Sequence, residues 1–387
     1  MTRNGFRASF IHTLGLIARD KAMILMLILA PILYGFYYPW PYSTQLIYET
    51  QIGIVDQDKS TLSRQIQRFI NASPYTELQP LNDQRSAYQA LVRREIDGYV
   101  VIPSGLSRAI TLGNPAALEV NVNSAYLLLG KSALTGILGA TGTVSAGIEL
   151  TRFAAQGLST AQANVLRDPV PLIINPRYNP NEGYGNYVVP AVSWLILQQT
   201  LLIGAALFIG TLTEQRRVTA TPSGWAGRIA ALSIINMIMV VFYTGWIFMV
   251  QGYAHGGNPL GNLLLITLFS PTVASLGCLL GLWFKVRERA LQILTFSSLP
   301  LFFLSGYSWP LEVMPDALLI LRWLTPSTAA IQAGVHFNQM NAPISANLHY
   351  LFALAALGLA AYVLLIFTGR IKPENEQSSD TDTHNAA

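Results

Sequence analysis

Few side chains in this 387-residue sequence are spaced as a reactive site would require. The five histidines are scattered, and none lies three or four residues from another histidine or from Cys278, so no metal site is indicated. The sequence has no GxSxG motif; a Ser/His/Asp triad assembled from residues far apart in the chain stays open. We therefore expect no metal, no cofactor and no catalysis in this chain.

The stretch most similar to a phosphate-binding loop is Ala125–Ser132, AYLLLGKS, which lies between an expected strand and an expected helix. A phosphate-binding loop wraps phosphates with successive backbone N–H groups, which requires glycine-like conformations rather than Tyr-Leu-Leu-Leu. No later strand ends in an aspartate suited to hold Mg²⁺. Nucleotide binding is therefore not expected here.

The stretch Leu299–Pro315, LPLFFLSGYSWPLEVMP, carries one carboxylate, Glu312. Pro310 and Pro315 cannot continue a regular helix, and Gly306 relaxes the backbone where the chain bends. Because Glu312 has no closely paired carboxylate, general acid–base catalysis is disfavoured. We expect a membrane helix to end here in a helical hairpin or re-entrant turn that closes the outer end of a pathway.

The composition is that of a membrane protein. Hydrophobic residues make up 51% of the chain and charged residues only 11%, against about 25% charged residues in an average soluble domain. Six uncharged apolar runs come near the roughly 20 residues that a bilayer requires: Ala22–Tyr38, Val188–Leu212, Ile229–Val250, Leu263–Phe284, Ala290–Leu304 and Tyr350–Thr368. A seventh span at Ser132–Ile148 is disfavoured because that stretch is mostly Gly, Ala, Ser and Thr.

Residues 1–21 are expected to form an amphipathic helix on the cytoplasmic membrane surface, with Phe6, Phe10, Leu14 and Ile17 on its apolar face. An ordinary solvated helix is the alternative. Residues 22–42 then form the first span, which we interpret as an uncleaved signal anchor ending in interfacial aromatic residues.

The distribution of Lys and Arg predicts the orientation, because these residues are retained on the cytoplasmic side. With the N-terminus inside, the outer short loops hold only Arg322. The inner segments hold twelve cations: Arg3, Arg7, Arg19, Lys21, Arg216, Arg217, Arg228, Lys285, Arg287, Arg289, Arg370 and Lys372. We expect both termini in the cytoplasm, a five-helix membrane domain over 188–369, and a disordered cytoplasmic tail over 370–387.

Residues 43–187 have the composition of a soluble domain, which the orientation places outside the cytoplasm. Eleven basic and eleven acidic residues make it neutral, so no nucleic-acid surface is indicated. Alternating patterns predict a small α/β domain, with strands at Gln51–Val55, Thr76–Leu81, Gly98–Ile102 and Leu118–Val122 and helices at Thr61–Ile70, Asp83–Arg94 and Ala125–Gln156. Ser60 and Asn82 are the expected N-caps of the first two helices. The fold class is thus a polytopic α-helical membrane protein with six transmembrane helices and an inserted extracytoplasmic α/β domain.

Three stretches make the chain similar to the permease subunits of ABC-2 type exporters, in the subgroup with a large extracytoplasmic domain between the first two spans. Arg19–Lys21 before an apolar run that contains Pro31 resembles the family's first span. The stretch Ile54–Ser60, IVDQDKS, and Gly98–Pro103 resemble parts of its external domain. The third stretch resembles the signature after the family's fifth span, and it consists of Ser305, Gly306, Pro310, Glu312, Met314, Pro315 and Pro326.

The resemblance implies a bacterial inner-membrane permease that exports an amphiphilic or hydrophobic substrate. It implies a cytosolic ATP-binding cassette ATPase, a second permease subunit, identical or related, and in some systems a periplasmic adaptor, with membrane lipids around the spans. The loop between the second and third spans would receive the ATPase stroke; its matched residues are Glu214, Arg216, Arg217 and Pro222. The loop lacks the Gly-Thr pair of the family pattern, which favours an asymmetric pair of permeases.

Two other function classes are weaker alternatives. A membrane-anchored scaffold or receptor would bind a partner through the external domain. A secondary transporter is disfavoured because the six runs contain no Asp, Glu, Lys or Arg, the residues that usually mark ion pathways.

Overall fold

The computed structural model describes residues 5–369 and divides the chain into two compact units. Unit 2 is Thr44–Asn175, and unit 1 consists of the chain before it and the chain from Pro176 onward. Unit 2 ends at Asn175, twelve residues before the predicted end of the inserted domain at 187. The predicted tail over 370–387, and the cations Arg3, Arg370 and Lys372, lie outside the described residues.

Unit 2 is built on a four-stranded sheet with the strand order β2-β1-β3-β4. Its strands are β1 (Thr50–Asp56), β2 (Thr76–Pro80), β3 (Gly98–Ile102) and β4 (Glu119–Val122). Strand β1 pairs in parallel with β2 and β3, and β3 pairs antiparallel with β4. Its helices are α4 (Thr61–Asn71), α5 (Gln84–Val92), α6 (Leu106–Thr111), α7 (Leu127–Ala155) and α8 (Thr160–Arg167).

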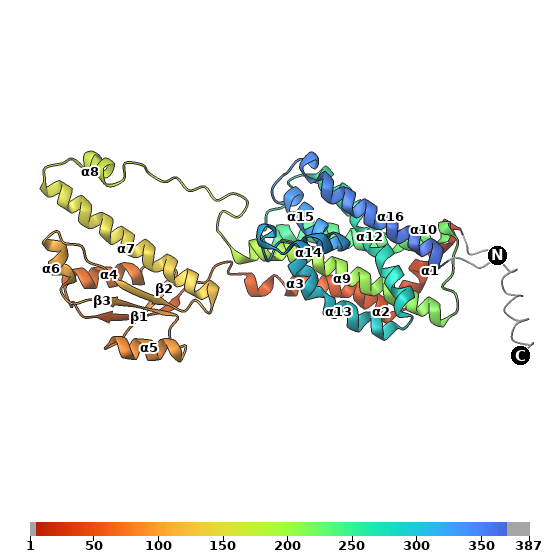
Figure 1. The fold of residues 1–387 in the computed structure, drawn as a ribbon, viewed down its shortest axis with the longest axis horizontal. Helices are drawn as coiled ribbons and strands as arrows, with labels where there is room; N and C mark the ends of the chain where they lie inside the picture. The colour runs from red at the N-terminus through yellow and green to blue at the C-terminus, as the bar shows by residue number, and fades with distance from the viewer. Residues whose placement is uncertain (1–4, 370–387) are drawn as a thin grey trace, which may run out of the picture. The chain divides into compact units, whose positions relative to one another are not determined.

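Helices cover both faces of this sheet (Figure 1). On one face, Ile52, Ile54 and Val100 form a core with α4 and with Ile137 of α7. On the other face, Val55, Tyr99 and Val101 pack against Ala87 and Ala90 of α5. The alternation of side chains along each strand sends successive residues to opposite cores, as expected for a sheet buried on both sides.

The IVDQDKS stretch fixes the loop at the end of β1. The Asp56 carboxylate accepts hydrogen bonds from the backbone N–H groups of Asp58 and Lys59, at 3.1 and 2.9 Å. Its other oxygen accepts from Ser63 Oγ at 2.7 Å and Gln67 Nε2 at 2.8 Å. All four bonds lie inside unit 2, so this carboxylate is fully used in holding β1 to α4.

The predicted elements of unit 2 are largely confirmed. All four strands and three helices lie within a few residues of their expected positions, and Ser60 caps α4 by accepting from the Ser63 N–H at 3.0 Å. The cap of α5 is Asp83 rather than Asn82, because the Asp83 carboxylate accepts from Ser86 N–H at 2.7 Å and Ser86 Oγ bonds back. Helices α6 and α8 were not predicted.

Unit 1 is entirely helical in its described part. Its first elements are α1 (Phe6–Ile17), α2 (Lys21–Ile24), the π-helix η1 (Leu25–Leu29), α3 (Ala30–Tyr37) and the 3₁₀-helix η2 (Trp40–Tyr42). After unit 2 come α9 (Tyr184–Glu214), α10 (Pro222–Val241), the π-helix η3 (Phe242–Ile247), α11 (Phe248–Val250), α12 (Pro259–Phe284) and α13 (Arg287–Leu304). The last elements are η4 (Leu311–Val313), α14 (Asp316–Leu321), η5 (Arg322–Leu324), α15 (Pro326–Asn338), η6 (Ile344–Asn347) and α16 (Leu348–Thr368).

Six helices of the described chain are long and apolar enough to cross a membrane: Lys21–Tyr42, Leu127–Ala155, Tyr184–Glu214, Pro222–Val250, Pro259–Phe284 and Ile344–Thr368. Five of them correspond to predicted spans. The predicted fifth span, Ala290–Leu304, lies in the shorter helix α13, whose first turn carries Arg287 and Arg289. The sixth candidate is α7, which packs one face against the sheet of unit 2 with Ala133, Ile137, Ala140 and Val144 buried.

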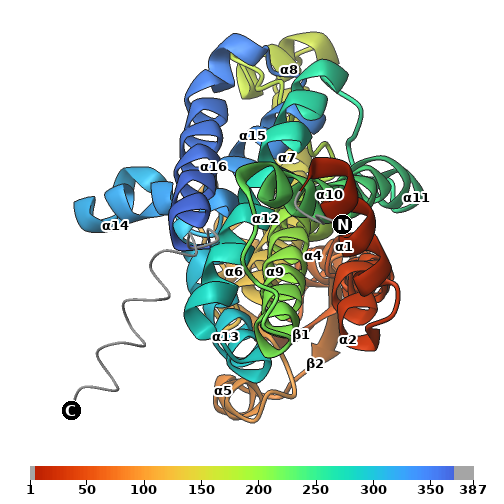
Figure 2. The same ribbon diagram turned by 90° about the vertical axis from the view of Figure 1, so that its right-hand side faces the viewer.

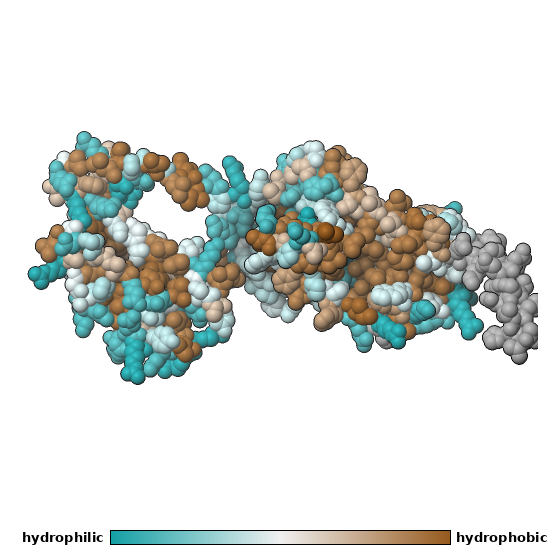
Figure 3. Space-filling view, viewed as in Figure 1, coloured by the Kyte–Doolittle hydropathy of each residue, from teal (hydrophilic) through white to brown (hydrophobic). Residues whose placement is uncertain are grey.

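Helix α9 is the core of unit 1. Nearly every residue from Val188 to Gly210 is buried, and α9 is surrounded by α12, α13, α15 and the first span. Much of the outer surface of these helices is hydrophobic (Figure 3), as expected where a helix bundle contacts lipid.

The four residues predicted for the apolar face of α1 are covered to different extents: Ile17 is buried, Phe10 and Leu14 are partly covered, and Phe6 is exposed. The buried residues of this helix are Ser9, Thr13 and Ile17, while Phe6 is half exposed. The small polar side chains face α10, where Gly227 allows a close approach: a Cβ at this position would lie 2.3 Å from the Phe6 carbonyl oxygen. This close approach of the two backbones covers Ser9 and Thr13 together with Ile17.

The Asp58 carboxylate links the β1–α4 loop to α6, because it accepts from the Ser107 N–H at 3.2 Å. The hydrogen bond from Ser60, followed by those from backbone N–H groups, lowers the Asp58 pKa. Because the pKa is lower in the folded state, the stabilisation is present above the unfolded value near 4 and is lost as pH falls through the lowered pKa.

We predict that Asp58→Ala weakens α6 by about 1 kcal/mol, the usual effect of losing a side-chain acceptor at a helix N-terminus. Hydrogen exchange of the full chain at pH 7 should show faster exchange of residues 105–111. Glu95→Ala is the control, since it breaks the exposed Arg93–Glu95 pair, which we expect to contribute little. Unchanged exchange in Asp58→Ala would contradict this assignment.

Candidate functional site

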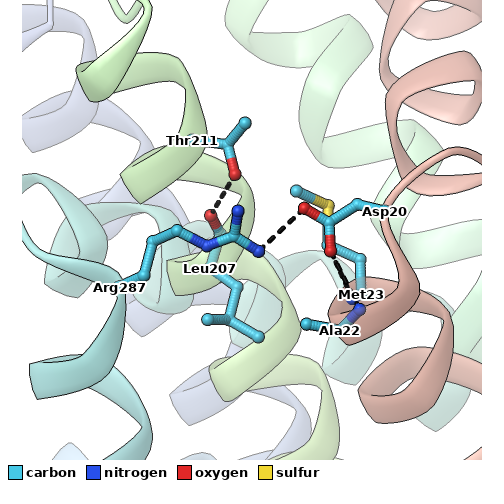
Figure 4. A network of polar contacts seen from close by, with 6 residues as sticks. All are labelled: Asp20, Ala22, Met23, Leu207, Thr211 and Arg287. Atoms are coloured by element: carbon cyan, nitrogen blue, oxygen red, sulfur yellow. Dashed lines mark hydrogen bonds and ion pairs between the residues drawn. The ribbon is translucent and has the colours of Figure 1, made fainter.

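An ion pair joins the first span to α13 at one end of unit 1. Arg287 Nη2 lies 2.7 Å from Asp20 Oδ2, and the two side chains are 22% and 19% exposed. The other Asp20 oxygen caps α2 by accepting from the N–H groups of Ala22 and Met23, at 2.9 and 3.1 Å. Figure 4 shows Arg287 extending past α9 toward Asp20, so a single carboxylate fixes the start of α2 and the start of α13.

The connection between α9 and α10 lies at the same end and is held by its backbone. Arg228 donates to the carbonyl oxygens of Val218, at 2.6 Å, and Arg217, at 3.2 Å. The Ala220 N–H and the indole N–H of Trp225 both donate to the Gly369 carbonyl, at 3.0 and 3.2 Å. Three helices therefore meet at this connection: α9, α10 and α16.

An open cleft of about 650 Å³ separates this connection from α1 and the turn that follows it. It is lined by His12, Gly15, Leu16, Arg19, Gln215 and Arg217. Arg216, in the same connection, has a φ of +52° and is exposed, as are Arg19 and Arg217. The cleft therefore presents positive charge, and it could receive an acidic or polar segment of a partner.

The opposite end of α13 terminates in a hydrogen-bonded turn. Ser305 is buried; its Oγ donates to the Phe302 carbonyl at 2.6 Å, and its own carbonyl accepts from Gln332 Nε2 at 2.9 Å. Gly306 follows with a φ of +74°, and a Cβ there would lie 2.2 Å from Leu311 Cδ2. Only glycine therefore fits this position without displacing the chain.

A ladder of tyrosines lies around this turn. Tyr187 and Tyr307 stack with ring centroids 4.9 Å apart, and each hydroxyl donates to the other's carbonyl, at 2.5 and 2.8 Å. Tyr184, Tyr42 and Tyr38 continue the ladder, with successive centroids 5.5 to 6.2 Å apart. We call these five residues the tyrosine ladder; it joins the first span, the start of α9 and the end of α13.

Comparison with known proteins identifies the family of this chain. Residues 21–367 match the family described as ABC-2 family transporter protein. The chain belongs to the ABC-2 transporter family. It is also 22% identical over 321 residues to "Probable multidrug ABC transporter permease YbhR" of Escherichia coli K12, covering 80% of this chain and 82% of that protein. The protein of the same name from Escherichia coli O157:H7 matches to the same extent.

Family membership makes this chain a multi-pass membrane protein of a family of transporter permease subunits, which are not themselves enzymes. Among the described residues, no group of three or more His, Cys, Asp or Glu side chains could hold a metal ion. The resemblance to ABC-2 permeases is thus confirmed.

The structure brings some of the predicted site residues together and separates others. At the α9–α10 connection, Glu214 is the last residue of α9 and Pro222 the first of α10, where its carbonyl accepts from Tyr362 Oη at 2.9 Å. Glu214, Arg216 and Arg217 are exposed on the connection itself.

The signature after α13 divides in two. Ser305, Met314 and Pro326 are buried, and Ser305 and Pro326 lie near one another through the bond between Thr328 Oγ1 and the Leu304 carbonyl, at 3.4 Å. Pro310 precedes η4 as its N-cap residue, Pro315 precedes α14, and Glu312 is exposed. The expected turn at Gly306 is present, and α14 and α15 follow it as two separate short helices.

Several residues of these two ends were missed as site residues by sequence reasoning. Asp20 and Arg287 are 267 positions apart, and no local pattern pairs them. Gln332 lies in α15, a buried helix that was not predicted. The tyrosines of the ladder were visible only as separate interfacial aromatic residues, whose enrichment near membrane surfaces was the one available signal.

We predict that Arg287→Ala lowers the free energy of unfolding of the purified chain in detergent by about 1–3 kcal/mol, because the partly buried Asp20 carboxylate loses a charge-assisted partner. Asp20→Asn should have a similar effect, although asparagine can still cap α2. The matched control is Arg289→Ala, which removes an exposed cation two residues away.

A double-mutant cycle tests the pairing. If the two residues act through their ion pair, the double variant should be destabilised by less than the sum of the single variants. Strict additivity would show that they act independently.

Proposed function

We propose that this chain is the permease subunit of an ATP-driven exporter in the bacterial inner membrane. The observation that carries the proposal is the positively charged cleft between α1 and the α9–α10 connection. It lies at the end of α9, the helix around which unit 1 is packed, so a force applied there acts on the centre of the bundle. A separate ATP-binding cassette ATPase would bind at this end.

The charge distribution supports a cytoplasmic location for the cleft. Seven of the eight exposed Lys and Arg residues in the described part of unit 1 lie at the end that bears Asp20 and Arg287: Arg7, Arg19, Lys21, Arg216, Arg217, Lys285 and Arg289. The eighth, Arg177, precedes α9. Lys and Arg are retained on the cytoplasmic side of a membrane. The tyrosine ladder would then face outward, and unit 2, inserted between Ser43 and Pro176, would be extracytoplasmic.

The outward location makes the Ser305–Tyr307 turn the candidate outer gate. The turn is bonded to α15 through Gln332 and to α9 through Tyr187. A shift of α13 relative to α9 must therefore either break these hydrogen bonds or move α15 and the start of α9 together with the turn. In this way the closure of the outer end depends on how the bundle is packed.

The substrate we propose is amphiphilic or hydrophobic, because the six apolar runs predicted as spans contain no Asp, Glu, Lys or Arg that could recognise an ion. The similarity to a probable multidrug permease of Escherichia coli supports this class. A second permease, identical or related, would cover the exposed apolar face of α13, where Phe296 is 85% exposed. The α9–α10 connection departs from the family pattern, which favours a related rather than identical partner; a periplasmic adaptor would join outside.

We predict that alanine at Glu214, Arg216 and Arg217 together lowers substrate-stimulated ATP hydrolysis by the complex about tenfold, the effect of losing about 1.4 kcal/mol of contact energy. The measurement is the turnover of the affinity-purified complex of this chain with its ATPase, reconstituted in lipid. Alanine at Arg93, Glu95 and Arg108, which are exposed in unit 2, is the control. Equal turnover of the two triple variants would refute the role of this connection.

We also predict that Gly306→Val reduces export strongly while leaving the amount of protein in the membrane nearly unchanged. A β-branched residue at this positive φ costs about 1–2 kcal/mol, and its Cβ would collide with Leu311. Gly252→Val is the control, because Gly252 also has a positive φ, of +70°, but no atom lies within 4 Å of its added Cβ.

Efflux of a lipophilic dye from cells, normalised to the membrane content of each variant, is the measurement for this pair. Equal loss of export in both variants would mean that backbone strain in any outer turn is sufficient to impair export, and would contradict a specific role for Gly306. Normal export by Gly306→Val would remove the gate assignment.

A further inference from the structure

The segment from Asp316 to Leu324, which forms α14 and η5, is unusually apolar for a segment with no buried residue. Ile320 is 74% exposed, and Leu321 and Leu324 are also exposed. Figure 2 shows α14 projecting outward beyond α16. In a membrane protein such a segment contacts lipid, and a helix that projects sideways from the spans suits the interface between acyl chains and headgroups.

Arg322 is the first residue of η5 and the only basic residue of this apolar segment. Its guanidinium carbon is 4.6 Å from the centroid of the Trp323 ring, so the cation rests on the indole face. Trp323 in turn packs against Tyr350 at the start of α16, with ring centroids 5.8 Å apart. The guanidinium is therefore held in place through Trp323, which packs against α16.

The guanidinium has hydrogen-bonding groups that the described residues do not satisfy. Nε and Nη1 of Arg322 are enclosed, and neither has an acceptor in the described part of the chain. Arginine keeps its charge in proteins, so the mismatch cannot be relieved by loss of a proton. Glu312 and Asp316, the carboxylates nearest in sequence, form no ion pair with it among the described residues. Enclosed donors of a charged group without an acceptor are costly, which calls for an anionic ligand.

We propose that Arg322 and Trp323 bind the phosphate of a phospholipid headgroup, while Ile320, Leu321 and Leu324 contact its acyl chains. Nη2 is the nitrogen that is not enclosed, so a phosphate oxygen approaching from outside meets it first. A turn of the guanidinium over the indole then presents a second N–H, which matches the paired oxygens of a phosphate. The cluster is a headgroup site at the end of α13 opposite Arg287.

A lipid fits this cluster better than a soluble anion or a second copy of the chain. Arg322 is flanked in sequence by the exposed aliphatic residues Ile320, Leu321 and Leu324, and Trp309, 55% exposed, lies on the same connection between α13 and α15. Tryptophan and a lone cation beside apolar residues are typical of the headgroup level of a bilayer. A soluble anion has no apolar part to contact the aliphatic side chains, and a second copy of the chain carries no phosphate.

The test is native mass spectrometry of the full chain, purified in mild detergent and mixed with palmitoyl-oleoyl phosphatidylglycerol. We expect Arg322→Gln to retain about fivefold less of this lipid than the unaltered chain, as expected for loss of a charge-assisted bond. Arg322→Lys should retain an intermediate amount, because lysine keeps the charge but not the fork of donors. Arg108→Gln, which removes an exposed cation from unit 2, should retain as much as the unaltered chain.

Two further arms identify the ligand. Palmitoyl-oleoyl glycerol, which has the same chains without phosphate, should not be retained in an Arg322-dependent way, and millimolar inorganic phosphate should not displace phosphatidylglycerol. Equal retention by Arg322→Gln and the unaltered chain would overturn the proposal. So would displacement by inorganic phosphate, which would indicate a soluble-anion site. A photo-crosslinking residue at Leu324 should capture phosphatidylglycerol, and capture of a second protein chain there instead would also overturn it.

Discussion

Close packing around α9 is the constraint on which the rest of unit 1 depends. Lipid tails are as apolar as the helices, so helices in a membrane associate through tight packing of small residues rather than through the hydrophobic effect. Added Cβ atoms at Gly204, Gly277 and Gly334 would lie 2.3 Å from Leu27, 2.7 Å from Ala205 and 2.2 Å from Trp194, respectively. Each contact brings a different helix against α9, and together they leave only the two ends of α9 accessible.

The two ends differ in chemistry, and that difference follows from their surroundings. At one end, the Asp20–Arg287 pair and the exposed cations present charge that water and a partner can solvate. At the other end, the tyrosine ladder offers rings to the interface and hydroxyl groups to the backbone. Helix α13 runs from the first end to the second, bonded by Arg287 at its start and by the Ser305 turn at its finish. Its first and last turns are therefore both fixed to the helices around α9.

The sequence predicted the elements of this structure better than their contacts. Alternation and turn residues located the four strands of unit 2, because such patterns are local. Helix α15 was missed because PSTAAIQAGVHFN is short and only moderately apolar, and its burial comes from neighbours distant in sequence. Hydrophobic periodicity likewise cannot reveal that Gly227 lets the backbone of α1 approach α10 closely. The turn at Gly306 could be predicted because glycine and proline restrict the backbone directly.

The position of Asp20 shows why motif residues in such a protein need not be reactive. One of its oxygens satisfies two N–H groups that a helix N-terminus leaves unpaired, and the other holds a guanidinium from the far end of the chain. Moving α13 away from α2 would leave Arg287 partly buried without its partner, whereas moving both helices together keeps the pair intact. The ion pair therefore favours joint motion of the first span and α13 over separate motion. The Asp20 carboxylate, part of the Arg19–Lys21 stretch that resembles the family's first span, thus links two helices of unit 1.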